Sequence, residues 1–172
     1  MSDVELRPAR SSDLGALTEI YNHYVRETPI TFEIEPYDVE ARRPWLEGFA
    51  PKGPHRLFVA EQRGELLGYA GSMRFRAKAA YETSVETTVY LRPEAAGQRI
   101  GASLYARLFE SLEGEDLHRA LAGITLPNPA SIRLHERFGF RPVGVFREVG
   151  RKLGRYWDVA WYEKSLGISG RP

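Results

Sequence analysis

The segment of residues 95–102, Ala-Ala-Gly-Gln-Arg-Ile-Gly-Ala, has the composition of a phosphate-binding loop. It follows the β-branched run of residues 86–91 and precedes an apolar-periodic stretch at 104–112, an order that predicts a strand, a glycine loop and a helix. Such a junction directs several unpaired backbone N–H groups and the positive end of the helix dipole at one point, which suits a phosphate or pyrophosphate. A tight structural turn is the alternative interpretation, because short glycine loops before helices are common.

Other kinds of chemistry are excluded or disfavoured by composition. The chain has no cysteine, which excludes disulfides, thiolate nucleophiles and cysteine-based metal sites and favours a cytoplasmic location. His23, His55 and His118 lack the spacing of metal ligands, so we expect no metal. The formal net charge of +1 argues against a nucleic-acid or anionic membrane partner. No apolar run approaches the ~18 residues of a membrane-spanning helix, and the first residues lack the pattern of a signal peptide.

The elements that must position the loop form one predicted domain, residues 1–172, without internal repeats or linkers. Before the loop, the patterns predict a strand at 4–7 and a helix that begins at Ser11 or Ser12 and is ended by Pro29. The inward face of that helix is expected to carry Leu14, Leu17, Tyr21 and Tyr24. A second helical stretch is predicted around 39–49, followed by strands at 57–60 and 66–75 that are joined by a turn at 63–65.

The order of elements around the loop indicates a mixed sheet. The connection 76–80 is too short for a crossover helix, so the strands at 66–75 and 84–91 are expected to be antiparallel neighbours. The apolar run 120–126 follows a helix, which predicts a parallel strand buried on both faces. Asn128 is placed to cap the next helix, and the β-branched and aromatic tail at 143–146 and 156–162 predicts a closing hairpin.

Residues Asn128 through Phe140 read Asn-x-x-Ser-x-x-Leu-His-x-x-x-Gly-Phe. Together with the strand, glycine loop and helix before them, they resemble the GNAT acetyltransferase superfamily. Further segments resemble its phosphinothricin and methionine sulfoximine acetyltransferases, over nearly the whole chain: Asn22-His23-Tyr24, Thr31-Phe32-Glu33, Ala80-Tyr81, Glu86-Thr87-Thr88-Val89-Tyr90, Leu126-Pro127-Asn128 and Trp157-Asp158.

The resemblance implies an α/β fold with a mixed central sheet of about six to seven strands flanked by about four helices, and acetyl-CoA in the splay between two parallel strands. It places the pantetheine arm on Val89, Tyr90 and Leu91, the pyrophosphate on Gly97, Gln98, Arg99, Ile100, Gly101 and Ala102, and the next helix against the ligand through Asn128 and Ser131.

The sequence departs twice from the family's Arg/Gln-x-x-Gly-x-Gly pattern, which falls on residues 96–101. Ala96 replaces the polar first residue and Arg99 replaces the middle glycine. We expect Arg99 to take a helical φ without strain, and its guanidinium to restore the polar group missing at position 96. Because of these departures, a CoA-binding sensor or scaffold without turnover is an alternative function.

The resemblance assigns the chemistry to Glu86 and His135. Glu86 is the candidate general base, on the same strand face as Thr88, and a solvated edge carboxylate is the alternative. A backbone N–H near Val89 would polarise the thioester carbonyl. His135 is the candidate acid for the leaving thiolate, either as a proton donor or only as a hydrogen-bonding group.

The expected acceptor is the α-amino group of a small amino-acid analogue, attacked directly in a ternary complex. The resemblance gives as pocket residues Phe32, Phe75, Arg76, Lys78, Tyr81, Thr87, Thr88 and Tyr156. Arg76 and Lys78 would grip a carboxylate, phosphinate or sulfoximine, although both would equally suit a solvated loop. Another small amine or a protein N-terminus is the alternative acceptor. The relatives are commonly homodimers, and we expect Trp157, Trp161 and Tyr162 to supply an apolar interface.

Overall fold

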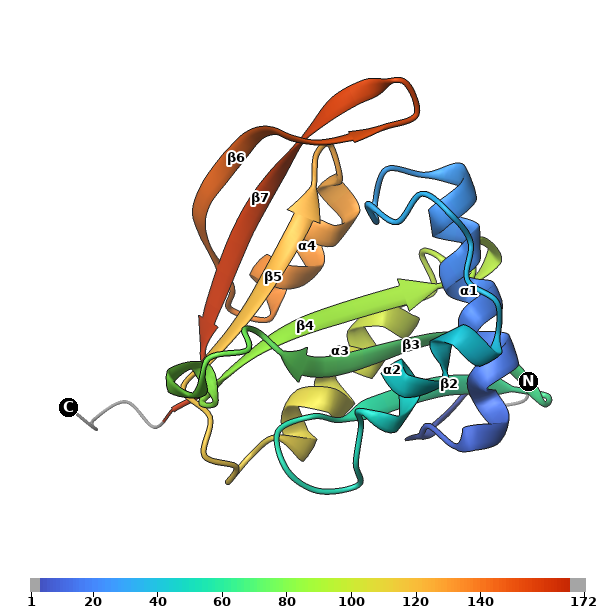
Figure 1. The fold of residues 1–172 in the computed structure, drawn as a ribbon. Helices are drawn as coiled ribbons and strands as arrows, with labels where there is room; N and C mark the ends of the chain where they lie inside the picture. Colours follow the sequence, from blue (N-terminus) through green and yellow to red (C-terminus); the bar gives the residue numbers. More distant parts are fainter. Residues whose placement is uncertain (1–3, 168–172) are drawn as a thin grey trace.

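In the computed structural model, which describes residues 4–167, one seven-stranded sheet runs through the molecule (Figure 1). Its elements are β1 (Glu5–Pro8), α1 (Leu14–Glu27), α2 (Arg43–Glu47), β2 (Leu57–Gln62), β3 (Glu65–Arg74), β4 (Ser84–Leu91), α3 (Ile100–Ser111), β5 (Arg119–Thr125), α4 (Pro129–Arg137), β6 (Arg141–Lys152) and β7 (Arg155–Ser165). The strand order is β1-β2-β3-β4-β5-β7-β6, and β4 and β5 form the parallel pair among otherwise antiparallel neighbours. The predicted mixed α/β fold is confirmed.

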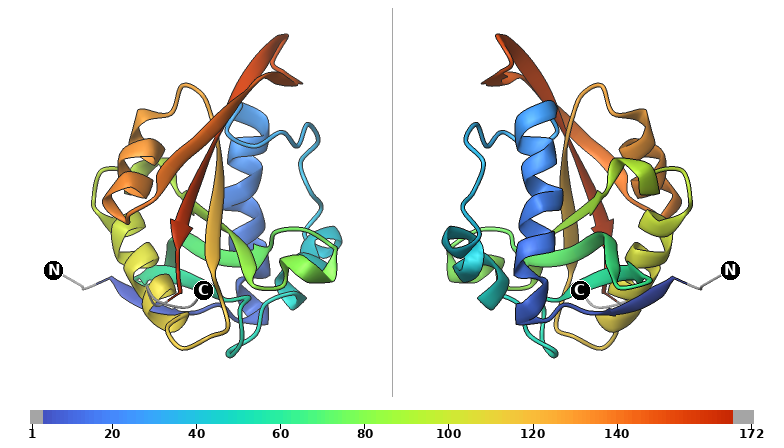
Figure 2. Two further views of the ribbon diagram at one scale, coloured as in Figure 1. Left: turned by 90° about the vertical axis from the view of Figure 1, so that its left-hand side faces the viewer. Right: turned by 90° about the vertical axis from the view of Figure 1, so that its right-hand side faces the viewer.

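The helices cover both faces of the sheet. Figure 2 shows α1 and α2 on one side and α3 and α4 on the other. The α3 side holds the larger core, in which Leu104, Tyr105 and Leu108 are fully buried against β2 to β5. A smaller core joins α1 to β2 and β3 through residues such as Leu17 and Tyr69. No helix in the described part of the chain is long and apolar enough to span a membrane.

The parallel pair β4–β5 is short. It includes only the pairs Ser84–Arg119, Val85–Ala120 and Glu86–Leu121, after which the two strands separate (Figure 1). On its other edge β4 stays paired with β3 from Val85 to Leu91, and β5 stays paired with β7 along its whole length. The sheet therefore opens in a V whose apex is at Glu86.

The hairpin β6–β7 extends beyond the body of the molecule (Figures 1 and 2). Its strand β6 carries exposed apolar side chains. Exposure is 59% for Val143, 56% for Phe146 and 55% for Val149. Near its tip, the buried Lys152 donates a hydrogen bond of 2.7 Å to the carbonyl of Thr31, which fastens the hairpin to the loop after α1.

Some local expectations were wrong in ways that matter for the site. The strand β5 is not buried on both faces, because Gly123 is exposed toward the opening of the V. Of the aromatic residues expected at a dimer interface, Tyr162 is buried, whereas Trp157 and Trp161 are partly exposed. The exposed apolar surface of the hairpin lies instead on β6.

Candidate active site

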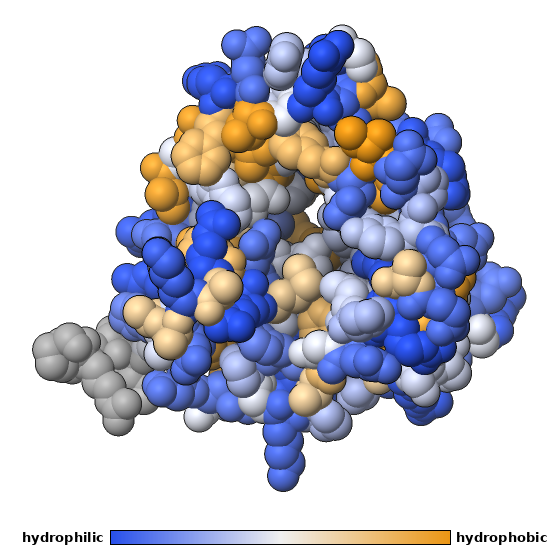
Figure 3. All heavy atoms as spheres, viewed as in Figure 1, coloured by the Kyte–Doolittle hydropathy of each residue, from blue (hydrophilic) through white to orange (hydrophobic). Residues whose placement is uncertain are grey.

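A cavity of about 650 Å³ lies between the sheet, the loop after α1 and the hairpin, and Figure 3 shows it as a hollow below the apolar surface of the hairpin. Its described lining is Tyr21, Ile30, Thr31, Phe32, Glu33, Tyr37, Ala41, Arg42, Trp45, Tyr69, Met73, Glu86, Thr87, Thr88, Tyr90, Gly123, Thr125, Phe146, Val149, Val159 and Trp161. We call it the acceptor cavity.

A smaller cavity of about 50 Å³ lies within the V, on the side of α3 and α4. The two cavities share six residues of their lining, Ile30, Thr87, Thr88, Tyr90, Gly123 and Thr125, so they meet where β4 and β5 separate. A molecule in one cavity can thus reach a molecule in the other through the sheet.

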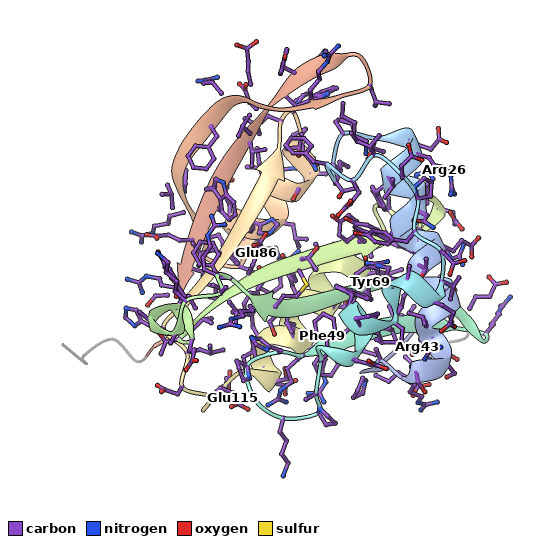
Figure 4. All side chains as sticks on the ribbon, viewed as in Figure 1. Arg26, Arg43, Phe49, Tyr69, Glu86 and Glu115 are labelled. Carbon is purple, nitrogen blue, oxygen red and sulfur yellow. The ribbon has the colours of Figure 1, made fainter. Side chains whose placement is uncertain are left out.

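Glu86 lies next to this meeting point, in the last residue pair that joins β4 to β5, and it lines the acceptor cavity but not the smaller one. Its side chain, labelled in Figure 4, lines the acceptor cavity. Thr88, two residues further along the strand, lines the same cavity. Burial raises the pKa of the Glu86 carboxyl, and the positive charge of Arg76 opposes that rise. A carboxylate with a raised pKa is a better proton acceptor than an exposed one, which suits a general base.

The buried imidazole of His135 belongs to the smaller cavity. Its Nδ1 lies 2.7 Å from the carbonyl oxygen of Ser131, and because a carbonyl only accepts, Nδ1 must carry the proton. In the neutral ring Nε2 is then an acceptor for the hydroxyl of Tyr105, 2.8 Å away. Burial lowers the pKa of His135, and burial raises the pKa of Tyr105, so both groups favour their uncharged forms.

The glycine loop leads into α3 at the edge of the V. The first hydrogen bond of the helix runs from the N–H of Ser103 to the carbonyl of Arg99 (3.0 Å), so the earlier N–H groups of α3 have no partner in the preceding turn. Gly101 packs against β4, where an added Cβ would lie 3.5 Å from Leu91 and 3.8 Å from Val89. The predicted order of strand, loop and helix is confirmed.

The expectation for the backbone of Arg99 was wrong. Arg99 caps α3 with φ of 63° and ψ of 4°, which is left-handed and not helical in the ordinary sense. The chain must reverse between Ala96, which is extended, and Ile100, which is helical, and a left-handed residue performs that reversal. The family's glycine fits this position without strain, whereas arginine carries a steric cost.

Asn128 and Ser131 lie together at the start of α4, as the motif predicts. The Asn128 side chain accepts a hydrogen bond of 3.1 Å from the N–H of Ser131, which confirms it as the helix cap. Both residues line the smaller cavity with Val89, Thr87 and His135.

The structure brings only part of the predicted pocket together. Phe32, Thr87 and Thr88 line the acceptor cavity, but its described lining does not include Phe75, Arg76, Lys78, Tyr81 or Tyr156. Phe75 packs between Tyr81 and Trp161, with ring centroids 5.6 Å and 6.0 Å apart, and the Arg76 guanidinium stacks on the Phe75 ring. These residues form the cluster behind Trp161, at the rim of the cavity. Tyr156 is exposed on the hairpin.

Sequence reasoning missed the aromatic end of the acceptor cavity. There Arg42 and Trp45 lie beside Tyr21, Tyr37 and Tyr69. The one available signal was the spacing of Arg42 and Trp45, which places both on one face of the helical stretch around 39–49.

We expect His135 to remain neutral, with its proton on Nδ1, well below the pH at which an exposed imidazole protonates. Nitrogen-resolved NMR of the two ring nitrogens, followed from pH ~8 to pH ~5, measures both the tautomer and the pKa. Because the pKa of His135 is lower in the folded protein than in the unfolded chain, acid protonates the unfolded chain first. The free energy of unfolding should therefore decrease as the pH is lowered. A short histidine peptide in the same buffer is the reference; an imidazole at His135 that protonates together with it would contradict the assignment.

Comparison with known proteins agrees with this geometry. Residues 6–161 match the family model described as an acetyltransferase (GNAT) domain. A phosphinothricin N-acetyltransferase of Streptomyces coelicolor is 62% identical over 96% of this chain and 98% of its own length. An L-methionine sulfoximine/L-methionine sulfone acetyltransferase of Pseudomonas paraeruginosa is 34% identical over 94% of both chains.

Among solved structures, a GNAT superfamily phosphinothricin acetyltransferase from Sinorhizobium meliloti in complex with acetyl-CoA superposes with a TM-score of 0.90. It is 32% identical, and the match covers all of this chain and 94% of that one. The opened sheet, the glycine loop and the family match agree: this chain belongs to the GNAT acetyltransferase family.

Proposed function

We propose that this protein transfers the acetyl group of acetyl-CoA to the α-amino group of a small amino-acid analogue such as phosphinothricin or methionine sulfoximine, by direct attack in a ternary complex. The observation that carries the proposal is the position of Glu86, a half-buried carboxylate in the acceptor cavity, directly before Thr87, where the two cavities meet through the sheet. The names of the relatives supply the acceptor class, since they act on these analogues by name.

The residues around the smaller cavity fit acetyl-CoA, which would supply the acetyl thioester. Past Glu86 one edge of β4 has no strand beside it, so we propose that the backbone of Val89 and Tyr90 pairs with an extended pantetheine arm. Leu91 would contribute less, because its carbonyl already accepts a hydrogen bond of 2.6 Å from the hydroxyl of Tyr24. The left-handed turn at Gly97 and Arg99 presents the first N–H groups of α3, from Ile100 to Ala102, to a pyrophosphate, and Gln98 is fixed by a bond of 2.8 Å to the carbonyl of Glu94. We propose no metal in the reaction.

In this proposal Glu86 accepts one proton of the acceptor's ammonium group, and the N–H near Val89 polarises the carbonyl that the freed amine attacks. The C–N bond forms as the C–S bond of the thioester breaks, and the departing CoA thiolate takes up the second proton that the nitrogen loses. His135 serves as a hydrogen-bonding group and not as the acid, because its Nε2 is occupied by the Tyr105 hydroxyl and carries no proton. It thereby holds Tyr105 beside Thr87, whose hydroxyl lies 3.4 Å from that of Tyr105.

Arg76 is proposed to bind the acceptor's α-carboxylate. Its positive charge opposes the rise that burial causes in the pKa of Glu86, so Arg76 acts at the end of the cavity where the reacting amine would lie. In this proposal Phe75 and Tyr81, which pack with Arg76 and Trp161, complete the binding site together with Lys78, and Tyr156 extends it along the hairpin.

We further propose a cytoplasmic homodimer. The exposed apolar side chains of β6 are unusual for a free surface, and two of them, Phe146 and Val149, also line the acceptor cavity. A second copy packed on β6 would therefore cover apolar surface and close one wall of the cavity at the same time.

Replacing Glu86 by glutamine should lower turnover by ~10²–10⁴ while acetyl-CoA affinity stays nearly unchanged, because glutamine keeps the shape but cannot accept the proton. In the parent enzyme, activity should fall on acidification at a higher pH than an ordinary glutamate would dictate, since the pKa of Glu86 is raised. The variant should recover activity as pH rises and more of the amine is already deprotonated. Glu33→Gln, in the same cavity, is the matched control; equal turnover in both variants would refute the base assignment.

Acetyl-CoA should raise the melting temperature of the protein, by a stabilisation of ~2.7 kcal/mol at a hundredfold excess over its dissociation constant. Gly101→Asp should reduce that shift strongly because it adds a negative charge beside the pyrophosphate site. Gly101→Ala is the control, since an added Cβ meets only ordinary contacts there. No shift at millimolar acetyl-CoA in the parent protein would remove the proposed co-substrate.

Light scattering should return about twice the chain mass of 19.5 kDa at micromolar concentration. Val143→Glu should shift the protein to the monomer, because Val143 is exposed on β6 and lies outside the acceptor cavity. Val39→Glu, at an exposed valine away from the hairpin, is the control. A parent protein that scatters as a 19.5 kDa particle would disprove the dimer.

A further inference from the structure

Arg42 is a buried cation for which the described residues provide no carboxylate partner. Only 4% of its surface is exposed, and the ion pairs of the structure do not include it. Its guanidinium donates to the carbonyl of Leu17 (3.0 Å) and to the hydroxyl of Tyr69 (3.2 Å). A guanidinium has more N–H groups than these two bonds use, and a buried charge without a counter-ion is costly.

The surroundings of Arg42 hold it in one orientation. Its guanidinium is stacked between the rings of Tyr21 and Trp45, with centroids 4.0 Å and 3.9 Å away. Stacking covers both faces of the plane, so any remaining contact must be made at its edge. Because Arg42 also lines the acceptor cavity, that edge forms part of the cavity wall.

The charges of the acceptor cavity are arranged in a pattern that fits a particular ligand. Arg42 is the single basic residue in its described lining, and the acidic residues there are Glu86 and Glu33. Glu33 is exposed and accepts a hydrogen bond of 2.9 Å from the hydroxyl of Tyr37, and it forms no ion pair with Arg42. The cavity therefore offers one unpaired cation and, at Glu86, one proton acceptor.

The sheet register separates these two groups. Met73 pairs with Glu86, and Tyr69, which bonds Arg42, lies four residues away on the same strand and pairs with Tyr90. Four residues of a strand span about 13 Å. Figure 4 shows the same separation, with Glu86 near the apex of the V and Tyr69 toward α1.

We propose that the edge of Arg42 binds the side-chain anion of the acceptor, at the end of the cavity opposite Glu86. This rests on the proposed function, since Glu86 must hold the amine. The fitting ligand carries an anion several atoms from its amine, as a γ-phosphinate or γ-carboxylate amino acid does. Arg42 is then a specificity residue that favours acceptors with an anionic head group over neutral ones of the same shape.

The test compares two acceptors in the full-length enzyme, phosphinothricin, whose head group is anionic, and methionine sulfone, whose tetrahedral head group is neutral. Arg42→Gln should raise KM for phosphinothricin about tenfold or more, as the loss of a charge-assisted hydrogen bond implies, with kcat little changed. The KM for methionine sulfone should change far less. Arg42→Lys, which keeps the charge, should retain most of the preference and serves if the glutamine variant does not fold.

A purely structural role for Arg42 predicts the opposite pattern, an equal rise of KM for both acceptors and a smaller stabilisation by acetyl-CoA. Either result would overturn the inference and leave the acetyltransferase assignment in place. Calorimetric titration of phosphinothricin into the CoA-bound parent enzyme and into Arg42→Gln tests separately whether phosphinothricin is the acceptor and whether Arg42 binds it. Binding in the parent without turnover would refute the proposed acceptor, whereas binding of equal strength in both proteins, or in neither, would refute the role of Arg42.

Discussion

The shortness of the parallel pair between β4 and β5 is the constraint on which the rest of the structure depends. Each strand keeps its antiparallel partner over most of its length, β3 for β4 and β7 for β5, but the two share only three residue pairs. The strands of a sheet are twisted, and with so few shared pairs nothing holds them together past Glu86. The opening joins two cavities, and Glu86, the proposed base, lies next to the point where they meet.

The two sides of the opened sheet differ in their charge. On the side of the smaller cavity, burial keeps His135 and Tyr105 uncharged, and their mutual hydrogen bond satisfies both. On the acceptor side, Glu86 and Arg42 are charged groups in a half-enclosed space. One sheet thus separates a neutral environment, suited to a thioester, from a polar one suited to an amino acid.

Local patterns predicted those features that depend on neighbours in the sequence. The strand, loop and helix from 84 to 111, and the cap at Asn128, follow from residue types within a few positions of one another. Arg42 could not be found in this way, because its role depends on Tyr21 and Tyr69, which the fold brings from two other elements. Likewise, the family resemblance gives Arg76 as a pocket residue, but in the structure Arg76 packs on Phe75 and does not line the cavity. The side chain that contacts Phe75 and lines the cavity is Trp161, from the last strand.

The left-handed backbone of Arg99 has a consequence for how such loops are recognised in sequences. The turn requires a conformation, and glycine is only the residue that adopts it most easily. A search pattern that insists on glycine at this position will therefore pass over chains that keep the same arrangement of N–H groups with another residue. In this chain the substitution also places a cation next to the start of α3, where it makes up for the polar residue that the family's pattern carries at position 96.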